Sequence, residues 1–409
     1  MNKESKNIII LSHLFPPYNQ IGAKRAYYFA KYLSELGMKV TVLSAELPKE
    51  YSKWEVDCSS FEVIRFNQIS QNALPKTLLT GKVGKVFRTF NFFLSPIESE
   101  SRIEFNPKKV EKADIIFATG GPWQTFEYGA LLKSKKTNAK LIFDYRDPWT
   151  ITDPDVALNS LNNFGWGIIG TLKSKFLQKK EMKLLLNVDA ITSVTEAVLK
   201  NVDPLITKKT PSKVIFNGFD KNDCVESSIK KDELWITYTG ILREEQEHSF
   251  FLEAVELLFT NNPNLVSKIK FNFIGSDHIR SKEVISRFKN HKFSSNFIIT
   301  TFVSNKEAKL IQSRSDILLN FSYTGKKGIM SGKIFEYLAI KKPILLISNN
   351  IDVMEDLVKS TNTGQICSSP SKIEDTILSW YKEWENSGAI QYLPNKDEVN
   401  KYTYKVQAK

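Results

Sequence analysis

The stretch 322–338 combines glycines, lysines and one glutamate in a pattern suited to holding an anion. It reads SYTGKKGIMSGKIFEYL, a loop that leads into a helical pattern. Backbone amides at a helix N-terminus attract phosphate groups, and a lysine beside them adds charge. Lys333 would supply that charge, and Glu336 could accept two hydrogen bonds from ribose hydroxyls. A capped helix whose Glu336 meets a nearby lysine is the structural alternative. The predicted nucleotide-diphosphate site comprises Gly328, Ile329, Ser331, Gly332, Lys333 and Glu336.

Two apolar stretches in the second half, 235–239 and 270–274, end at glycines. A glycine lets the backbone approach a ligand closely, and an arginine binds phosphate through two parallel hydrogen bonds. We therefore expect Gly240, Gly275 and Arg243 to line the same diphosphate site. An ordinary surface arginine is the alternative for Arg243.

The segment DYRDPW follows another apolar stretch, 140–144, and carries two carboxylates and an arginine. A carboxylate near an arginine stays ionised and can orient a hydroxyl or stabilise positive charge. Asp147, Asp144 and Arg146 are therefore predicted as catalytic residues. The alternative is a structural ion pair in a turn before the proline.

The loop after the first apolar stretch, 7–14, contains Gly22 and Arg25 and opens a helical pattern. The glycine and the helix N-terminus would again suit an anion, so both residues are predicted to contact a donor. The pair Gly120-Gly121 follows a further apolar stretch and could receive an acceptor, with a plain loop as the alternative.

Short apolar stretches alternate with helical patterns along the whole chain. This alternation predicts parallel sheets with crossover helices, and 409 residues exceed what one hydrophobic core normally supports. We expect two Rossmann-like domains, 1–205 and 206–385, and a tail, 386–409, that returns to the first domain. Ligands bind such sheets at the carboxyl ends of the strands. The expected strands are 7–14, 39–44, 114–118, 140–144, 190–194, 213–216, 235–239, 270–274, 297–300, 317–321 and 344–348, and the expected helices are 24–36, 250–259, 306–313, 332–339 and 372–384.

The net charge of +12 points to an anionic partner: nucleic acid, a membrane surface or a phosphorylated substrate. Nucleic acid is disfavoured because the basic residues are spread over both halves without a recognisable nucleic-acid-binding module. The segments 74–97 and 161–186 mix lysines with aromatic and aliphatic residues, which is typical of a helix lying on an anionic membrane and equally of a core-facing helix with a basic outer face.

The three cysteines are far apart, and the four histidines lack metal-binding spacing. Neither a disulfide framework nor a zinc site is predicted, and we expect neither a metal nor a cofactor. No apolar run reaches the ~18–20 residues that span a bilayer. The expected location is the cytoplasm, either free or at the inner face of the plasma membrane.

Several motifs together carry a family resemblance. They are the FPP opening with its later glycine and arginine, the DYRDPW segment, Asn217-Gly218-Phe219-Asp220, Tyr238-Thr239-Gly240 and SGKIFEYLAIKKPIL. In these motifs the chain resembles the retaining family-4 glycosyltransferases of bacterial polysaccharide type. The resemblance runs over nearly the whole chain. It implies the α/β GT-B fold, in which two Rossmann-like parallel-sheet domains face a central cleft. It also implies metal-independent transfer of a hexosyl unit, with retention, from a nucleotide sugar to a glycan or lipid-linked glycan during cell-surface polysaccharide biosynthesis.

The resemblance assigns roles to the candidate residues. Glu336 would bind the ribose, Lys333 and the loop 328–332 would lie near the diphosphate, and Arg243 would add charge there. Gly22 would lie near the transferred sugar, while Asp147 and Asp144 would lie near the reacting sugar or the acceptor. The remaining predicted donor contacts are Arg25, Asn217, Gly240 and Gly275.

The chain departs from the family pattern at several positions, among them a first-domain strand-end loop with Asp144-Tyr145-Arg146-Asp147 where many members have a histidine. Gly328 stands where many members have a glutamate, Ile241 where they have an arginine, and Gln246 where they have a lysine. These differences favour a second hypothesis, in which the chain is a catalytically inactive GT-B-like protein that binds or scaffolds a partner.

Overall fold

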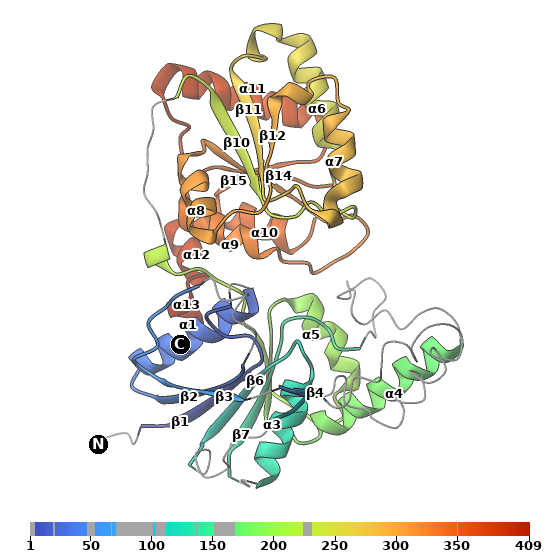
Figure 1. Cartoon of the computed structure of the whole chain (residues 1–409), viewed down its shortest axis with the longest axis vertical. Coiled ribbons are helices and arrows are strands. Elements are labelled where there is room, and N and C mark those ends of the chain that lie inside the picture. Colours follow the sequence, from blue (N-terminus) through green and yellow to red (C-terminus); the bar gives the residue numbers. More distant parts are fainter. Residues whose placement is uncertain are drawn as a thin grey trace. The chain divides into compact units, whose positions relative to one another are not determined.

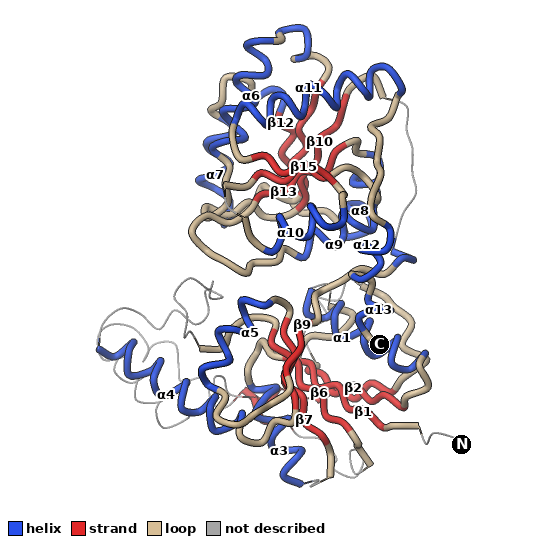
Figure 2. The backbone as a smooth tube through the Cα atoms, turned by 180° about the vertical axis from the view of Figure 1, so that it is seen from behind, coloured by secondary structure: helices blue, strands red, loops and turns tan. Residues whose placement is uncertain are grey.

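The computed structural model describes residues 5–18, 21–46, 54–66, 68–70, 101–103, 112–135, 138–150, 168–223, 231–349 and 351–409. The chain forms two compact units, Met1–Phe216 with Ala408–Lys409, and Asn217–Gln407. In each unit a twisted sheet carries helices on its faces (Figure 1), and the strands lie side by side within each sheet (Figure 2).

The first unit is built on a sheet of seven described strands in the order β3-β2-β1-β6-β7-β8-β9, all paired in parallel. A separate antiparallel pair is formed by β4 and β5. The strands are β1 (Asn7–Ser12), β2 (Lys39–Ala45), β3 (Glu62–Phe66), β4 (Gln68–Ser70), β5 (Ser101–Ile103), β6 (Ile115–Thr119), β7 (Lys140–Tyr145), β8 (Ala190–Ser193) and β9 (Ser212–Val214). The helices are α1 (Ile21–Glu35), α3 (Gln124–Lys135), α4 (Ile168–Leu185) and α5 (Glu196–Val202).

The central strands of this sheet are apolar along most of their length, as in β1 with its sequence NIIILS, because helices cover both faces. Their register aligns the strand ends: Ser12 pairs with Thr119, and Thr119 pairs with Asp144. The loops that follow β1, β6 and β7 therefore leave the sheet at one edge, beside the point where the strand order reverses.

The structure corrects one strand assignment. The stretch 213–216 was predicted to open the second domain, but β9 pairs with β8, Ile191 opposite Ser212, as the last strand of the first sheet. The expected boundary between 205 and 206 therefore falls in a connection inside the first unit, and the second unit begins at Asn217.

The second unit has a six-stranded parallel sheet in the order β12-β11-β10-β13-β14-β15. Numbered within the unit, this is 3-2-1-4-5-6, the doubly wound order of dinucleotide-binding folds. The prediction of two Rossmann-like parallel-sheet domains is confirmed. The strands are β10 (Leu234–Thr239), β11 (Ile269–Ile274), β12 (Phe297–Ile299), β13 (Ile317–Phe321), β14 (Ile344–Ile347) and β15 (Gly364–Cys367). The helices are α6 (Ser249–Asn261), α7 (Lys282–Lys289), α8 (Asn305–Arg314), α9 (Gly332–Ile340), α10 (Val353–Thr361), α11 (Pro370–Ser387), α12 (Lys396–Lys401) and α13 (Tyr404–Gln407).

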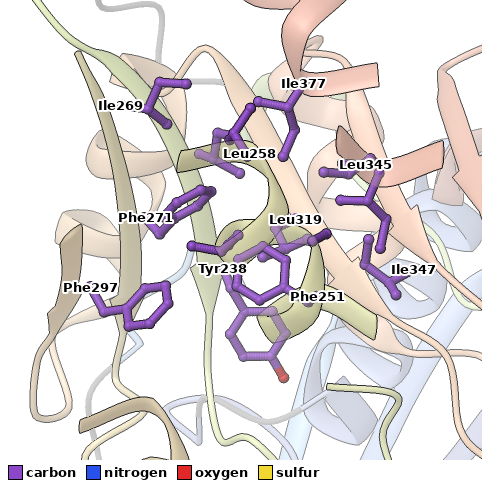
Figure 3. Close-up of a cluster of buried hydrophobic side chains, with 14 of the residues drawn as sticks. Tyr238, Phe251, Leu258, Ile269, Phe271, Phe297, Leu319, Leu345, Ile347 and Ile377 are labelled. Atoms are coloured by element: carbon purple, nitrogen blue, oxygen red, sulfur yellow. The ribbon is translucent and has the colours of Figure 1, made fainter. Parts of the chain in front are cut away.

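The core of the second unit forms where α6 and α11 pack on one face of the sheet. Phe251 and Leu258 of α6 lie against Phe271 and Leu319 of the strands, and Ile377 of α11 closes the cluster (Figure 3). All five side chains are fully buried. This packing fixes the positions of β10, β11 and β13 within the sheet, and the candidate donor residues follow the ends of these three strands.

The C-terminal segment predicted as a returning tail belongs to the second unit as far as Gln407. Its backbone pairs with the NGFD motif: the Phe219 amide donates to the Tyr402 carbonyl at 3.1 Å, and the Tyr404 amide donates to the Phe219 carbonyl at 3.0 Å. A Cβ at Gly218 would lie 2.5 Å from the Tyr402 carbonyl oxygen. The NGFD motif therefore binds the C-terminal segment through its backbone. The motif needs a glycine at position 218 because a side chain there would collide with that segment. Asn217, which was predicted to contact the donor, is buried and directly precedes Gly218 of this motif.

Candidate functional site

The second unit gathers the predicted diphosphate-binding residues at the carboxyl edge of its sheet. β10 and β13 are neighbours although β11 and β12 lie between them in sequence, so this is where the strand order reverses. Open parallel sheets bind ligands at this position. Gly240 follows β10, Gly275 follows β11, and the loop after β13 leads into α9. The structure thus brings these sequence-predicted elements together.

Lys333 lies in the first turn of α9 and reaches over the end of β10. Its Nζ lies 4.9 Å from the centroid of the Tyr238 ring. Gly240 has φ +106°, and a Cβ there would lie 2.8 Å from Lys333 Cε. Gly240 is thus required twice, for its backbone conformation and for the space that the lysine occupies.

Burial lowers the pKa of Lys333, although the nearby Tyr323 and Glu336 act in the opposite direction. The ammonium has already lost much of its water. An incoming phosphate would therefore meet a cation with little solvent left to displace, and charge–charge attraction is stronger in such surroundings.

The turn after β10 is held by the buried Gln246, one of the departures from the family pattern. Its Oε1 accepts a hydrogen bond from the Arg243 amide at 2.9 Å, and its backbone pairs with Tyr323. The Tyr238 hydroxyl donates to the Ile241 carbonyl at 2.9 Å. Gln246 therefore shapes this turn, whereas the Arg243 side chain is exposed.

The loop before α9 offers fewer amides than predicted. The Gly328 amide donates to Asp352 Oδ2 at 2.7 Å, and Asp352 also caps α10. This amide is therefore not available to a donor, whereas the position of the loop 328–332 near the diphosphate stays a prediction. Ser331, the N-cap of α9, makes no side-chain capping bond. The amides of Gly332 and Lys333 have no partner among the described residues and can face a ligand, with Ile329 and Ser331 half-buried beside them.

Glu336 and Phe302 complete the second-unit edge. Glu336 lies one helical turn after Lys333 and is close enough for its charge to raise the pKa of that lysine. Phe302 follows β12, is 73% exposed, and has its Cα 3.9 Å from where a Cβ of Gly275 would lie. Phe302 was not predicted from the sequence. Its signal was a large apolar residue in a polar loop, three positions beyond a strand end.

The first unit contains a buried ion pair between α1 and β7. Arg25 donates to both oxygens of Asp144, at 2.9 and 2.7 Å, and to the Phe216 carbonyl at 2.8 Å. Thr192 donates to Asp144 at 2.7 Å. Burial alone would raise the pKa of Asp144, but the charge and hydrogen bonds of Arg25 bring it below its usual value.

Both side chains of this pair are 0% exposed. A carboxylate whose two oxygens are engaged and enclosed cannot contact a substrate directly. The predictions that Asp144 is catalytic and that Arg25 contacts the donor are therefore revised. The pair ties α1 to the sheet below the strand-end loops. It differs from the ion pair within the turn that was considered from the sequence, because its arginine comes from α1.

Arg146 joins three strand-end loops. Its Nε donates to the Gly120 carbonyl at 2.5 Å, and its NH2 donates to the Gly121 carbonyl. A Cβ at Gly22 would lie 1.4 Å from Arg146 NH1, so only glycine fits there. Arg146 is accordingly a positioning residue for these loops, and Gly22 provides the space for its guanidinium.

Asp147 is the residue of the DYRDPW segment that remains available for chemistry. Its half-buried carboxylate accepts no hydrogen bond from the described residues. Burial raises its pKa, and the Arg146 charge only partly opposes this. A carboxyl group with a raised pKa can exchange a proton near neutral pH more readily than an exposed one.

His13 directly follows β1 and was missed in the sequence analysis, although its place at a strand end was a usable signal. Burial and the charge of Arg146 lower its pKa to about 4, so the imidazole is neutral at physiological pH. His13 and Asp147 are thus both influenced by Arg146, which indicates that the three side chains gather at one edge of the first sheet.

Glu181 of α4 holds the loop after β7 in place through hydrogen bonds. Its carboxylate accepts hydrogen bonds from the Tyr145 hydroxyl at 2.9 Å and from the Thr150 hydroxyl. Burial raises the pKa of Glu181 to about 7, more than these hydrogen bonds lower it. The group therefore titrates under physiological conditions while supporting the loop that contains Asp147.

This titration predicts a pH-dependent stability difference. Because the folded pKa exceeds the unfolded one, the folded protein retains a proton that the unfolded chain loses, and Glu181 reduces stability as pH rises from about 4.5 to 7. We expect Glu181→Gln to be more stable than wild type by about 2–3 kcal/mol at pH 8, with a smaller gap at pH 5. Urea unfolding at the two pH values measures it. Glu62→Gln, at an exposed carboxylate, is the control, and a gap independent of pH would contradict this reading.

Residues 220–392 match the family model described as glycosyl transferases group 1. The matched stretch contains Gly240, Arg243, Gly275, Lys333 and Glu336, so the candidate donor residues of the second unit lie inside the part of the chain that is similar to this family. A search of curated proteins found no match to the chain.

Solved structures share the architecture of the whole chain. A glycosyltransferase from Rickettsia africae is 15% identical with a TM-score of 0.61, covering 99% of this chain and 96% of its own. Sucrose-phosphate synthase from Thermosynechococcus elongatus is 11% identical with a TM-score of 0.59, covering 98% and 96%. Anabaena HepE in complex with UDP and glucose is 11% identical with a TM-score of 0.59, covering 98% and 97%. At these identities the likeness shows the fold, a GT-B-type pair of Rossmann-like domains.

None of the helices that the structure describes is both long and apolar enough to cross a membrane. The described His, Cys, Asp and Glu side chains form no group of three or more that could hold a metal ion.

Proposed function

We propose that this protein is a glycosyltransferase that moves a hexosyl unit from a nucleotide-sugar donor to a glycan or lipid-linked glycan. The observation that supports this best is the partly desolvated Lys333 ammonium above Gly240, at the N-terminus of α9 and inside the group 1 glycosyltransferase match. One of the similar structures, Anabaena HepE, holds UDP and glucose.

The donor would be held by groups from three strand ends. Lys333, Arg243 and the first amides of α9 face the diphosphate, and Glu336 accepts hydrogen bonds from the ribose. The exposed Phe302 ring offers a flat surface for the base. When the sugar departs, negative charge grows on the diphosphate, and fixed cations and amides stabilise it there. These groups supply the positive charge, so we propose transfer without a metal or other cofactor.

The first unit would provide the acceptor chemistry. Asp147 has a carboxyl group free to accept a proton or orient a hydroxyl, and the neutral His13 lies at the same sheet edge. Gly22 and Arg146 shape the loop around them. We further propose retention of configuration, a role in cell-surface polysaccharide biosynthesis and a cytoplasmic location, as the family resemblance implies.

The test separates ribose recognition from diphosphate recognition. Binding of UDP, GDP and ADP sugars is measured by thermal shift and calorimetry with EDTA present, since a ligand that binds only the folded state raises its stability. Glu336→Ala should weaken nucleotide binding roughly 30-fold or more, because two charge-assisted hydrogen bonds are lost. It should leave inorganic pyrophosphate binding nearly unchanged, and Glu336→Gln should be intermediate.

Equal loss of pyrophosphate and nucleotide binding in Glu336→Ala would contradict the ribose assignment. Absence of nucleotide binding throughout the panel would refute the proposed function. Donor hydrolysis or sugar transfer by the wild-type protein would exclude the inactive binding-protein alternative.

We also propose that the first unit rests on an anionic membrane through α4. Lys175, Lys179 and Lys183 are exposed along one face of this helix, and Leu172 and Leu186 near its ends are each 53% exposed. The opposite face is buried in the unit. The basic segment 74–97, which suggested the same surface, lies outside the described residues.

Replacing the three lysines by glutamine should reduce co-sedimentation with phosphatidylserine vesicles about 100-fold, since each lysine near such a surface contributes about 1 kcal/mol. A matched triple replacement of the exposed Lys282, Lys289 and Lys372 should leave co-sedimentation unchanged. Equal losses in both triples would show that only net charge matters and would refute a dedicated α4 surface.

A further inference from the structure

The second unit has a cavity of about 360 Å³ far from the candidate donor site. It is lined in part by Lys231, Lys268 and Asp316, which come just before β10, β11 and β13 in the chain. The candidate donor residues, in contrast, follow the ends of these strands. The cavity therefore opens at the amino edge of the sheet. A six-residue strand spans about 20 Å, so one small ligand cannot occupy both places.

A largely buried ion pair forms the polar wall of the cavity. Lys231 Nζ lies 2.6 Å from Asp316 Oδ2 and donates to the Arg314 carbonyl at 2.6 Å; the side chains are 8% and 12% exposed. Asp316 Oδ2 also accepts the Trp235 amide at 2.8 Å. The ammonium has three donors: two bond to Arg314 and Asp316, and Nζ also lies 4.7 Å from the centroid of the Trp235 ring. Among the described residues no hydrogen-bond acceptor takes the third donor, and no donor is bonded to Asp316 Oδ1. The pair thus presents one donor and one acceptor side by side.

Aromatic residues of α11 form the other wall. Trp384 is half-buried, and its ring centroid lies 5.9 Å from that of Tyr381. The Tyr381 hydroxyl donates a hydrogen bond to Glu385 Oε1 at 2.8 Å. In the described part of the chain no acceptor is bonded to the indole N–H of Trp384. This wall offers an apolar ring surface with a polar edge.

The charges of the cavity restrict the class of ligand. Two lysines, Lys231 and Lys268, face three carboxylates, Asp232, Asp316 and Glu385, which leaves one net negative charge. A phosphate or carboxylate would be repelled, and the inward Lys231 ammonium disfavours an organic cation. A neutral polyol can bond to both the ammonium and the carboxylate, because each hydroxyl donates and accepts a hydrogen bond. Its C–H face can at the same time cover the aromatic ring.

We infer that this cavity binds one neutral sugar unit of a glycan, with two adjacent hydroxyls on the Lys231–Asp316 pair and an apolar sugar face on Trp384. The inference is independent of the proposed transferase function, since it rests only on groups at the opposite sheet edge. It adds a glycan-binding site that neither the donor residues nor the first unit supplies.

The full chain is titrated with the methyl α-glycosides of glucose, mannose and N-acetylglucosamine and with maltotriose. Saturation-transfer NMR and calorimetry are run with excess UDP present to occupy the donor site. At least one probe should bind at millimolar concentration, and Trp384→Ala should weaken that binding about tenfold or more. Trp384→Phe, which keeps an apolar ring, should weaken it less. Lys231→Met with Asp316→Leu should abolish it while preserving burial. Trp380→Phe, at a half-buried tryptophan outside the cavity, is the matched control.

Several outcomes would overturn the inference. The first is that none of the sugar probes binds. The second is that sugar binding is lost in Lys333→Ala but kept in Trp384→Ala. The third is that tetramethylammonium binds more tightly than every sugar. Failure of these tests leaves nucleotide binding untouched, so the two proposals fail separately.

Discussion

Lys333→Ala is expected to weaken binding of both pyrophosphate and nucleotide sugars by roughly 100-fold, because it removes a partly desolvated cation that faces the diphosphate. The same change should leave the unfolding free energy unchanged or slightly raised, since burial of the ammonium costs stability in the unliganded protein. Calorimetric titration and urea unfolding of the same preparations measure the two quantities.

Lys289→Ala, at an exposed lysine of α7, is the matched control and should alter neither quantity. Lys333→Arg tests geometry: it keeps the charge, but a larger head group must fit beside Gly240. A Lys333→Ala protein that binds pyrophosphate normally would show that Arg243 and the α9 amides suffice, and the assignment of Lys333 would be wrong.

Asp144→Ala should destabilise the first unit by about 3–5 kcal/mol, because it leaves the Arg25 guanidinium buried without its partner. A typical domain has only about 5–15 kcal/mol of stability, so this unit would be partly unfolded at moderate temperature. Urea unfolding followed by the fluorescence of first-unit tryptophans measures the loss.

The double change Arg25→Met with Asp144→Leu removes both charges and should recover most of that stability. If it also recovers activity, the pair is structural, as its enclosure indicates. Asp144→Ala with normal stability but no activity would instead restore the catalytic assignment. Asp147→Asn is the contrasting variant, expected to reduce turnover with little effect on unfolding.

The architecture was predictable because its signals are local. Apolar runs such as 317–321 are buried on both faces and coincide with strands, and the glycines at 240 and 275 stand where the chain leaves the sheet. The strand β9 was misplaced because a three-residue edge strand reads equally well in either domain. Helix α10 was not predicted, although Met354, Leu357 and Val358 follow helical spacing.

The roles within the site were harder to predict, because they depend on which partner each side chain finds. Sequence spacing placed Asp144 and Asp147 together, but only the fold pairs Asp144 with Arg25, 119 positions away. Likewise, nothing local indicates that the Gly328 amide is taken by Asp352. That Lys333 and Glu336 lie close together could be predicted, because one helical turn relates them.

Arg146 makes three segments of the chain interdependent. Its guanidinium fits only while residue 22 lacks a side chain and while the carbonyls of 120 and 121 stay in place. Insertions or deletions in any one of these loops should therefore be poorly tolerated unless residue 146 changes with them. In a randomised library selected for function, we expect positions 22, 120, 121 and 146 to vary as a group. Acceptor preference would then be altered more readily by substitutions at neighbouring positions than by changing loop length.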